Sequence, residues 1–297
     1  MTATADTRTK GPLVWGDMDQ QALDAAYDQA NWAPNQQTLA DRRQSLSAEA
    51  RRFIPPPLRV AYGSADIEKI DIYKADVLKA PVAIFVHGGA WRRGKAADFA
   101  GLAEMFIRAG AHLAVLDFDN VDEHRGDLLA MAGQVRQAVA WVWKNAASFG
   151  GDPDRIYLTG HSSGAHLGGC MLTTDWSRFG VPQTFIKGAL LCSGMYDLAP
   201  VRLSKRSEYV KFTDETENEL SAMRHLDRLS CPVVLAIGTN ESPEFIRQTK
   251  DFATAVAAAG KPVELIEAPS YNHFEIVETL GNPYGVLGRA ALRLMGL

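Results

Sequence analysis

The stretch from Arg155 to Cys170 most constrains how this chain can fold. A short apolar, β-prone run leads into Gly-His-Ser-Ser-Gly at residues 160–164, and a helical run of small residues follows. Strand, sharp turn and helix form the context in which a Gly-x-Ser-x-Gly pattern presents a nucleophilic serine. We expect Ser162 to occupy a strained conformation at the apex, with no room for a Cβ at Gly160 or Gly164. An ordinary tight turn is the alternative.

Apolar runs and amphipathic helical patterns alternate along most of the chain. Strands are expected at residues 81–86, 111–118, 155–159, 185–192, 232–237 and 263–266. Helices are expected at residues 98–109, 126–149 and 243–259. Strands that are apolar throughout and joined by helices are typical of a parallel sheet covered on both faces. The sequence therefore predicts an α/β fold.

Two segments depart from this alternation. Residues 17–53, the N-terminal arm, carry two helical patterns (17–30 and 34–53), with Asp17 or Asp19 as the N-cap of the first. The arm is too short to bury a core alone, so we expect it to cover part of the sheet or the mouth of the active site. Residues 197–231 are polar and charged, and we expect them to form a small cap over the strand ends.

Two further segments precede the first strand of the alternating region. Residues 1 to about 16 are expected to be loosely ordered, and a β-hairpin is expected over residues 58–74. The whole chain, residues 1–297, is expected to form a single domain that includes the arm and the cap.

Charge and cysteine content narrow the class of protein. The net charge of −4 gives no electrostatic reason to bind nucleic acid or an anionic membrane. The chain starts without an apolar signal core and contains no run long enough to span a membrane. Cys170, Cys192 and Cys231 are odd in number, which favours buried free thiols over a disulfide framework. We expect a cytoplasmic enzyme that acts on a small molecule without a cofactor; a homodimer stays open.

A nucleophilic serine needs a histidine base and an acid that orients it. In serine hydrolases with this turn, the nucleophile comes first along the chain, then the acid, then the histidine. His273 lies beyond the last expected strand, in a loop that should return to the carboxyl edge of the sheet, and is the predicted base. Glu241, shortly after strand 232–237, is the predicted acid, with Asp197 as its rival. Glu244 is expected in the first turn of the next helix.

Paired glycines follow the strand that ends at residue 86. Glycines let backbone N–H groups approach a substrate oxygen without interference from side chains. We expect the amides of Gly88 and Gly89, with that of Ser163, to form the oxyanion hole, although a merely flexible turn is the alternative. His87 should anchor this loop without transferring a proton.

Three further residues are predicted to contact substrate. They are Trp91, His161 and Tyr196, and Trp91 is equally compatible with lining the pocket and with filling the core beneath it. His161 lies too close to the serine in the sequence to act as its base.

Several motifs together resemble one branch of a known superfamily. They are His-Gly-Gly-x-Trp at 87–91, Gly-His-Ser-Ser-Gly-Ala-His-Leu at 160–167, Ser-Gly-Met-Tyr-Asp-Leu at 193–198, Glu-Ser-Pro-Glu-Phe at 241–245 and Asn-His-Phe at 272–274. From about residue 17 onward the chain resembles the kynurenine formamidase (arylformamidase) branch of the α/β-hydrolases, which is similar to hormone-sensitive-lipase-type esterases. The resemblance implies an eight-stranded sheet, a Ser–acid–His triad, no metal, and activity on N-formyl arylamines such as N-formylkynurenine and often on small aryl esters.

One loop departs from the pattern of the related esterases. Where they usually carry Tyr-Arg-Leu-Ala-Pro, this chain has the charged loop 117–125. The loop should border the pocket, so it either selects a polar or cationic substrate or is simply solvated; we favour solvation.

The sequence therefore predicts a serine hydrolase that cleaves a small acyl amide or ester, most similar to an arylformamidase. A general carboxylesterase of short-chain or aryl esters is the alternative within enzymes. A non-catalytic ligand-binding protein of the same fold is the alternative outside them.

Overall fold

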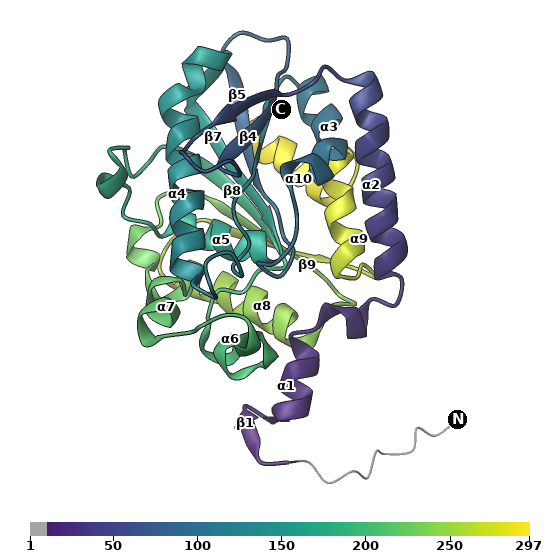
Figure 1. Cartoon of the computed structure of the whole chain (residues 1–297), viewed down its shortest axis with the longest axis vertical. Helices are drawn as coiled ribbons and strands as arrows, with labels where there is room; N and C mark the ends of the chain where they lie inside the picture. The colour runs from purple at the N-terminus through teal and green to yellow at the C-terminus, as the bar shows by residue number, and fades with distance from the viewer. Residues whose placement is uncertain (1–10) are drawn as a thin grey trace.

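An eight-stranded sheet forms the centre of the structure, a computed structural model that describes residues 11–297 (Figure 1). Its strands are β3 (Leu58–Ala61), β4 (Lys69–Tyr73), β5 (Ala80–Val86), β6 (His112–Leu116), β7 (Gly151–His161), β8 (Ile186–Cys192), β9 (Val233–Gly238) and β10 (Val263–Ala268). Their spatial order is β10-β9-β8-β7-β5-β6-β4-β3. Strands β5 to β10 run parallel, whereas β3 and β4 form the expected hairpin and add antiparallel strands at one edge. The prediction of a mostly parallel sheet is confirmed.

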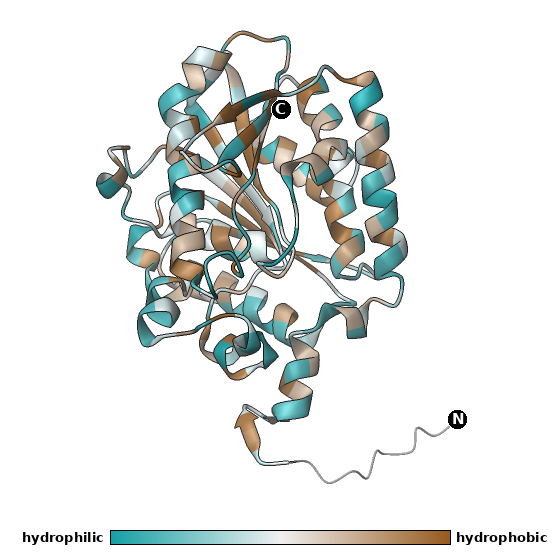
Figure 2. Cartoon of the chain, in the orientation of Figure 1, coloured by the Kyte–Doolittle hydropathy of each residue, from teal (hydrophilic) through white to brown (hydrophobic). Residues whose placement is uncertain are grey.

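The central strands are apolar on both sides because both faces of the sheet are covered. In β5, Val82 and Ile84 point into one core, while Ala83 and Phe85 point into the other. Figure 2 shows hydrophobic residues along these strands and hydrophilic residues on the outward sides of the helices. This arrangement explains why the sequences of these strands are continuous apolar runs and do not alternate between apolar and polar residues.

Helices cover both faces of the sheet. One face packs against α4 (Leu128–Asn145), α5 (Ser163–Leu172) and α8 (Pro243–Ala258). The other packs against η2 (Ala96–Leu102), α3 (Ala103–Arg108), α9 (His273–Glu278) and α10 (Val286–Met295), with α2 (Gln36–Phe53) outside them. Short 3-10 helices occur at η3 (Ala146–Phe149), η4 (Trp176–Phe179) and η8 (Thr279–Gly281).

One predicted helix is divided. The segment expected as a single helix over residues 98–109 forms the 3-10 helix η2 followed by the short α3. Gly101 lies inside η2 where α2 approaches closely: a Cβ there would lie 3.4 Å from the Cβ of Leu46. Glycine is a poor helix former, so packing against α2 decides the local geometry.

A short strand that the sequence did not reveal precedes the N-terminal arm. Residues expected to be loosely ordered include β1 (Leu13–Trp15), which pairs with β2 (Met18–Asp19); residues 1–10 lie outside the described part of the chain. The Arg247 guanidinium lies 5.6 Å from the ring centre of Trp15, so contact with the body of the protein orders this strand. Helix α1 (Gln20–Ala26) follows, and of the two candidate N-caps it uses Asp19, which accepts a hydrogen bond from the amide of Ala22.

Residues 197–231 form a series of short helices, namely α6 (Ala199–Leu203), η5 (Lys205–Glu208), α7 (Asp214–Glu219), η6 (Ala222–Arg224) and η7 (Leu226–Arg228). In Figure 1, α6 and α7 lie at the same end of the molecule as α1. The amide of Lys205 donates to Asp24 at 2.6 Å, and the side chain of Gln20 donates to the carbonyl of Leu203 at 2.8 Å. The cap and the arm therefore support one another at this end of the sheet.

The three cysteines are buried and unpaired, as expected. Burial raises the pKa of the Cys170 and Cys231 thiols to about 12, so both remain protonated. Within residues 11–297, no helix combines the length and the apolar character needed to cross a bilayer.

Candidate active site

The turn between β7 and α5 has the strained geometry that its sequence predicts. Ser162 adopts φ 58° and ψ −127°, a region that residues with a Cβ rarely enter. A Cβ on Gly164 would lie 2.0 Å from the carbonyl oxygen of Val86, and one on Gly160 would lie 2.6 Å from that of Gly164. Neither position can hold a side chain, so the two glycines permit β7 and α5 to meet at this sharp turn.

Three distant segments bring their polar side chains together at Ser162. The Ser162 hydroxyl donates to Nε2 of His273 at 2.8 Å, and Nδ1–H of His273 donates to Oε2 of Glu241 at 2.6 Å. All three residues are buried. Hydroxyl, imidazole and carboxylate therefore form a continuous chain of hydrogen bonds, the arrangement that lets an imidazole take a serine proton.

The rival carboxylates lie elsewhere. Asp197 accepts from the amide of Ala199 and faces Arg224 at 3.6 Å. Glu244 lies in the first turn of α8, as expected, where it accepts from Tyr27 at 2.7 Å and pairs with Arg247. Neither carboxylate contacts His273.

Ser193 belongs to this group of contacts, although the sequence did not single it out. Its hydroxyl donates to Oε1 of Glu241 at 2.6 Å, and the amide of Gly238 donates to the same oxygen at 2.9 Å. With Oε2 bound to His273, both carboxylate oxygens are satisfied and the Glu241 side chain has one orientation. The available signal was a polar residue directly after β8, at the carboxyl edge where parallel strands place functional groups.

His161 supports the predicted base from its backbone side. Its Nε2–H donates to the backbone carbonyl of His273 at 2.8 Å, and the two rings lie 4.6 Å apart. Burial, together with the nearby His273, holds the pKa of His161 well below its ordinary value. His161 is therefore neutral and fixes the segment that carries His273.

The glycine loop after β5 lies directly against Ser162. A Cβ on Gly88 would lie 2.9 Å from the Cβ of Ser162, and one on Gly89, whose φ is 136°, would lie 2.1 Å from the carbonyl oxygen of Arg93. Among residues 11–297, no intramolecular hydrogen bond uses the N–H of Gly88, Gly89 or Ser163. The three amides are thus free to donate to a substrate oxygen.

His87 anchors this loop through stacking as well as hydrogen bonding. Its ring lies between those of Phe118 (4.4 Å) and Phe99 (5.7 Å), and its Nδ1–H donates to the carbonyl of Gly88 at 3.1 Å. Burial lowers the pKa of His87, which keeps the ring neutral.

Two of the residues predicted to contact substrate are buried. The amide of Trp91 donates to Oγ of Ser163 at 3.2 Å, and its indole N–H donates to Nδ1 of His166 at 3.2 Å. Trp91 is therefore buried, with both of its N–H groups bonded within the protein. Tyr196 is fully buried and stacks on Phe252 at 4.1 Å. Direct contact of Trp91, Tyr196 or His161 with substrate stays a prediction.

The charged loop 117–125 is less solvated than expected. Asp117 is buried, pairs with Arg59 at 2.7 Å, and accepts from the amide of Ala96 at 2.6 Å. The prediction of a solvated loop is therefore wrong for Asp117, because Arg59 reaches it from the adjacent hairpin. Asp122 pairs with Arg92 nearer the surface, at 2.8 Å.

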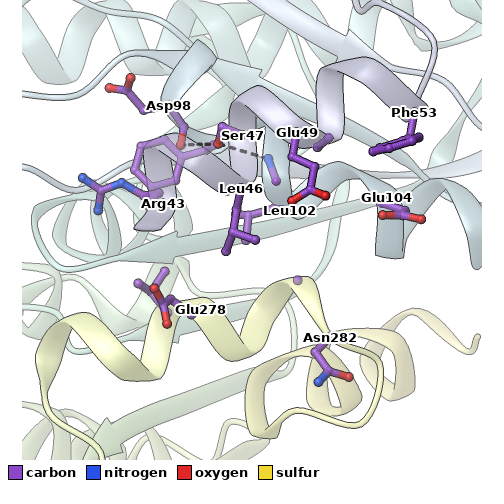
Figure 3. A pocket seen from close by; sticks show the side chains of 15 residues that line it. Arg43, Leu46, Ser47, Glu49, Phe53, Asp98, Leu102, Glu104, Glu278 and Asn282 are labelled. Atoms are coloured by element: carbon purple, nitrogen blue, oxygen red, sulfur yellow. Dashed lines mark hydrogen bonds between the residues drawn. The ribbon is translucent and has the colours of Figure 1, made fainter. Parts of the chain in front are cut away.

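A groove of about 470 Å³ lies away from this site, between α2, η2, α9 and η8 (Figure 3). Its lining includes Leu46, Phe53 and Leu102 but none of Ser162, Glu241 or His273. Within residues 11–297, no cluster of three or more His, Cys, Asp and Glu side chains is arranged to hold a metal.

The N-terminal arm contacts the segment that carries His273. Asn35 donates to Oε1 of Glu275 at 2.8 Å and accepts from the side chain of Asn272 at 2.8 Å. Asn272 caps α9, whose first residue is His273, and Glu275 closes the capping box by accepting from the amide of Asn272. Asn35 thus joins the N-terminal arm to the first turn of α9, which carries His273.

We expect Asn35→Ala to lower kcat about tenfold with little change in KM, because a misplaced His273 weakens proton transfer rather than binding. Asn35→Asp should be worse, since its carboxylate would face Glu275. The measurement is steady-state kinetics, with Gln37→Ala, an exposed position of α2, as the control. A change confined to melting temperature would show that Asn35 serves only stability.

We expect His166 to make the stability of the protein depend on pH. It accepts from Trp91 and donates from Nε2 to the carbonyl of Leu220 at 3.0 Å, and burial lowers its pKa from 6.5 to about 4. Between pH 6.5 and 4 the unfolded chain binds a proton at His166 that the folded chain does not bind. The free energy of unfolding therefore decreases as the pH is lowered from 6.5 to 4. The shift corresponds to about 3 kcal/mol at most.

Urea unfolding of the wild type and of His166→Gln measures this contribution. The variant lacks the titrating group, so the stability difference between the two proteins should narrow as the pH falls from 7 to 4.5. A constant difference would contradict a neutral, buried His166.

Two family models match parts of this chain. The BD-FAE family model matches residues 70–180, and the Carboxylesterase family model matches residues 129–235. Kynurenine formamidases of Danio rerio and Salmo salar are each 31% identical to this chain, with 95% of the chain and 98% of the relative covered. A putative thioesterase from Silicibacter sp. TM1040 superposes with a TM-score of 0.76 at 23% identity, over 93% of this chain and 99% of the other. Esterase B from Lactobacillus rhamnosis gives a TM-score of 0.70 at 19% identity, over 94% and 96%.

The fold and the comparisons define a serine hydrolase of the α/β-hydrolase class, acting on an acyl amide or ester. The two structural neighbours agree in fold. The identity extends over nearly the whole length of two curated relatives, and the chain belongs to the kynurenine formamidase family.

Proposed function

We propose that this enzyme removes the formyl group from N-formyl arylamines, with N-formylkynurenine as the representative substrate. The observation that carries the proposal is 31% identity to kynurenine formamidases over 95% of the chain, together with an assembled Ser162–His273–Glu241 chain of hydrogen bonds.

In the first step, Oγ of Ser162 attacks the formyl carbon while Nε2 of His273 takes the hydroxyl proton. Glu241 stabilises the imidazolium that forms. The amides of Gly88, Gly89 and Ser163 donate to the oxyanion of the tetrahedral intermediate, and such donors contribute roughly 3 kcal/mol each in related enzymes.

In the second half, His273 returns its proton to the nitrogen of the departing arylamine, and the C–N bond breaks to leave a formyl ester on Ser162. Water then attacks the ester carbon and gives its proton to His273. When the ester bond breaks, formic acid leaves and the proton returns to Ser162. Amines leave poorly unless they are protonated, so amide cleavage depends on the delivery of this proton by His273.

A general carboxylesterase is the second candidate, favoured by the match of residues 129–235 to the Carboxylesterase family. Esters have a better leaving group and need less help from His273. An enzyme with this site can therefore cleave aryl esters as a side activity even where a formamide is its main substrate.

The deciding experiment compares kcat/KM for N-formylkynurenine and p-nitrophenyl acetate. A clear preference for the formamide supports the proposal, and hydrolysis of the ester alone supports the carboxylesterase. If neither reacts and a fluorophosphonate does not label Ser162, the protein is a non-catalytic member of the fold.

Three broader features belong to the same proposal. The arm and the cap belong to a single catalytic domain, the enzyme works in the cytoplasm, and it forms a homodimer. Mutual support between the arm and the cap favours the first, and the three free thiols favour the second. Light scattering tests the third.

A further inference from the structure

The groove between helix α2 and the segment α9–η8 has the size of a ligand site (Figure 3). Its volume is about 470 Å³, which lies within the range of small-molecule pockets. Leu46, Leu102 and Val277 belong to its apolar lining. Leu46 and Phe53, two large apolar side chains that line it, remain 46% and 72% exposed. The groove therefore presents contiguous apolar surface to solvent, as binding sites do.

The walls of the groove are fixed by contacts that need no ligand. Oγ of Ser47 on α2 donates to a backbone carbonyl of η2 at 2.7 Å and accepts from the amide of Gly101 at 3.2 Å. Arg42 of α2 pairs with Glu278 of α9. Gly101 and Gly281 lie side by side in the lining, where a Cβ on Gly281 would lie 3.3 Å from the carbonyl oxygen of Gly101. The groove is therefore preformed, and a ligand that enters it loses little affinity to reorganisation.

Arg43 lies at one end of the groove with its charge unpaired (Figure 3). Within residues 11–297, no hydrogen bond or ion pair joins its side chain to another residue, and its Nε is buried without an acceptor. The guanidinium carbon lies 5.1 Å from the ring centre of Phe99, a contact that replaces lost water only in part. Burial lowers the pKa of Arg43, and the charges of Asp98 and Glu278 offset this effect only in part. An anion beside the guanidinium would supply the missing acceptor.

The carboxylates of the lining are engaged or lie away from Arg43. Glu278 is already paired with α2, and Asp98 accepts from a backbone amide at the start of η2 at 3.0 Å. Glu49 and Glu104 lie toward the other end, near Phe53 (Figure 3). A second negative charge on a ligand would be repelled at that end. The groove therefore suits a ligand with one anionic end and an uncharged body.

We propose that the groove binds an amphipathic carboxylate, with the carboxylate against the Arg43 guanidinium and an alkyl or aryl-alkyl body along Leu46 toward Phe53. Phe53 follows Arg43 by ten residues of α2, a rise of about 15 Å, so an extended body of several methylene groups suits the length. The lining contains none of Ser162, Glu241 or His273. Binding in the groove therefore does not depend on which bond the enzyme cleaves.

Isothermal titration calorimetry with three probes that share one body tests the anionic end. The probes are 6-phenylhexanoate, 6-phenylhexan-1-ol and 6-phenylhexylammonium. The wild type should bind the acid with a Kd at least tenfold lower than that of the alcohol, and the ammonium should bind no more tightly than the alcohol. Arg43→Met should bring the Kd of the acid close to that of the alcohol. Arg52→Met is the matched control, because Arg52 is exposed on the same helix outside the groove, and it should leave the three Kd values unchanged.

Leu46→Ser tests the apolar part of the groove. It should raise the Kd of the acid and of the alcohol alike by about fivefold, because both probes lose the same apolar contact. Leu78→Ser is the control, since Leu78 is exposed outside the groove. Leu46 is half exposed, so this variant should fold and can decide the question if Arg43→Met does not fold.

Four results would each overturn the site. They are no binding of the acid by the wild type, equal binding of acid and alcohol, tighter binding of the ammonium, and a Kd of the acid that is unchanged in folded Arg43→Met and in Leu46→Ser. The last result would place the acid elsewhere, the catalytic site included. Failure of the formamidase proposal would leave these titrations unaffected, since no probe contains a bond that the enzyme would cleave.

Discussion

Ser162→Ala should lower kcat by about 10⁴-fold or more on any substrate of the enzyme, because the variant has no atom able to form the acyl intermediate. The fold should remain intact, because the lost hydroxyl makes its hydrogen bond only to His273. Alanine can keep the strained backbone of Ser162 as serine does, since both carry a single Cβ.

The measurement is hydrolysis by variant protein purified on fresh resin, so that no wild-type enzyme contaminates it. Ser177→Ala is the control, since Ser177 is exposed on η4. Fluorophosphonate labelling should disappear in Ser162→Ala and persist in the control. Full activity of the pure variant would exclude Ser162 as the nucleophile.

Glu241→Gln should lower kcat by about 10³- to 10⁴-fold. The amide oxygen can still accept from Ser193 and Gly238, so the side chain should keep its place. Its NH₂ group would then face Nδ1 of His273 and favour the ring tautomer that carries its proton on Nε2. That tautomer cannot accept the proton of Ser162.

Glu264→Gln is the matched control, because Glu264 is exposed on β10 and pairs only with Arg293. It should keep kcat within about twofold, as expected for a surface ion pair of little energetic weight. Circular dichroism and urea unfolding should show both variants folded. If kcat falls less than tenfold in Glu241→Gln, a group other than Glu241 orients His273.

The nucleophile turn and the order of the functional segments could be predicted from the sequence because their information is local. Steric exclusion at Gly160 acts between near neighbours in the turn, the Gly-x-Ser-x-Gly pattern marks the turn itself, and strand–helix alternation follows from hydrophobic periodicity. His273 and Glu241 were predicted because the carboxyl ends of parallel strands meet at one edge, so a loop's place in the chain predicts its place in space.

Long-range contacts were decided by the tertiary structure alone. The position of Ser193 directly after a strand indicates the edge of the sheet at which it lies, but not that it binds Glu241. No local pattern indicates that Arg59 pairs with Asp117 or that Trp91 is buried. Each depends on which side chains from other elements reach the same point.

The contacts made by the arm and the cap show most clearly what the sequence alone does not predict. The helices of the arm were predicted from periodicity and capping residues, and the cap was predicted from its polar, charged composition. The contact of Asn35 with the His273 loop and the position of Arg206 beside Trp91 depend instead on packing between segments more than a hundred residues apart in the chain. Sequence alone determined the chemistry of the reacting groups, because that chemistry resides in side chains and short turns. Only the folded chain decided what surrounds those groups, because hydrogen bonding, burial and charge pairing act through space.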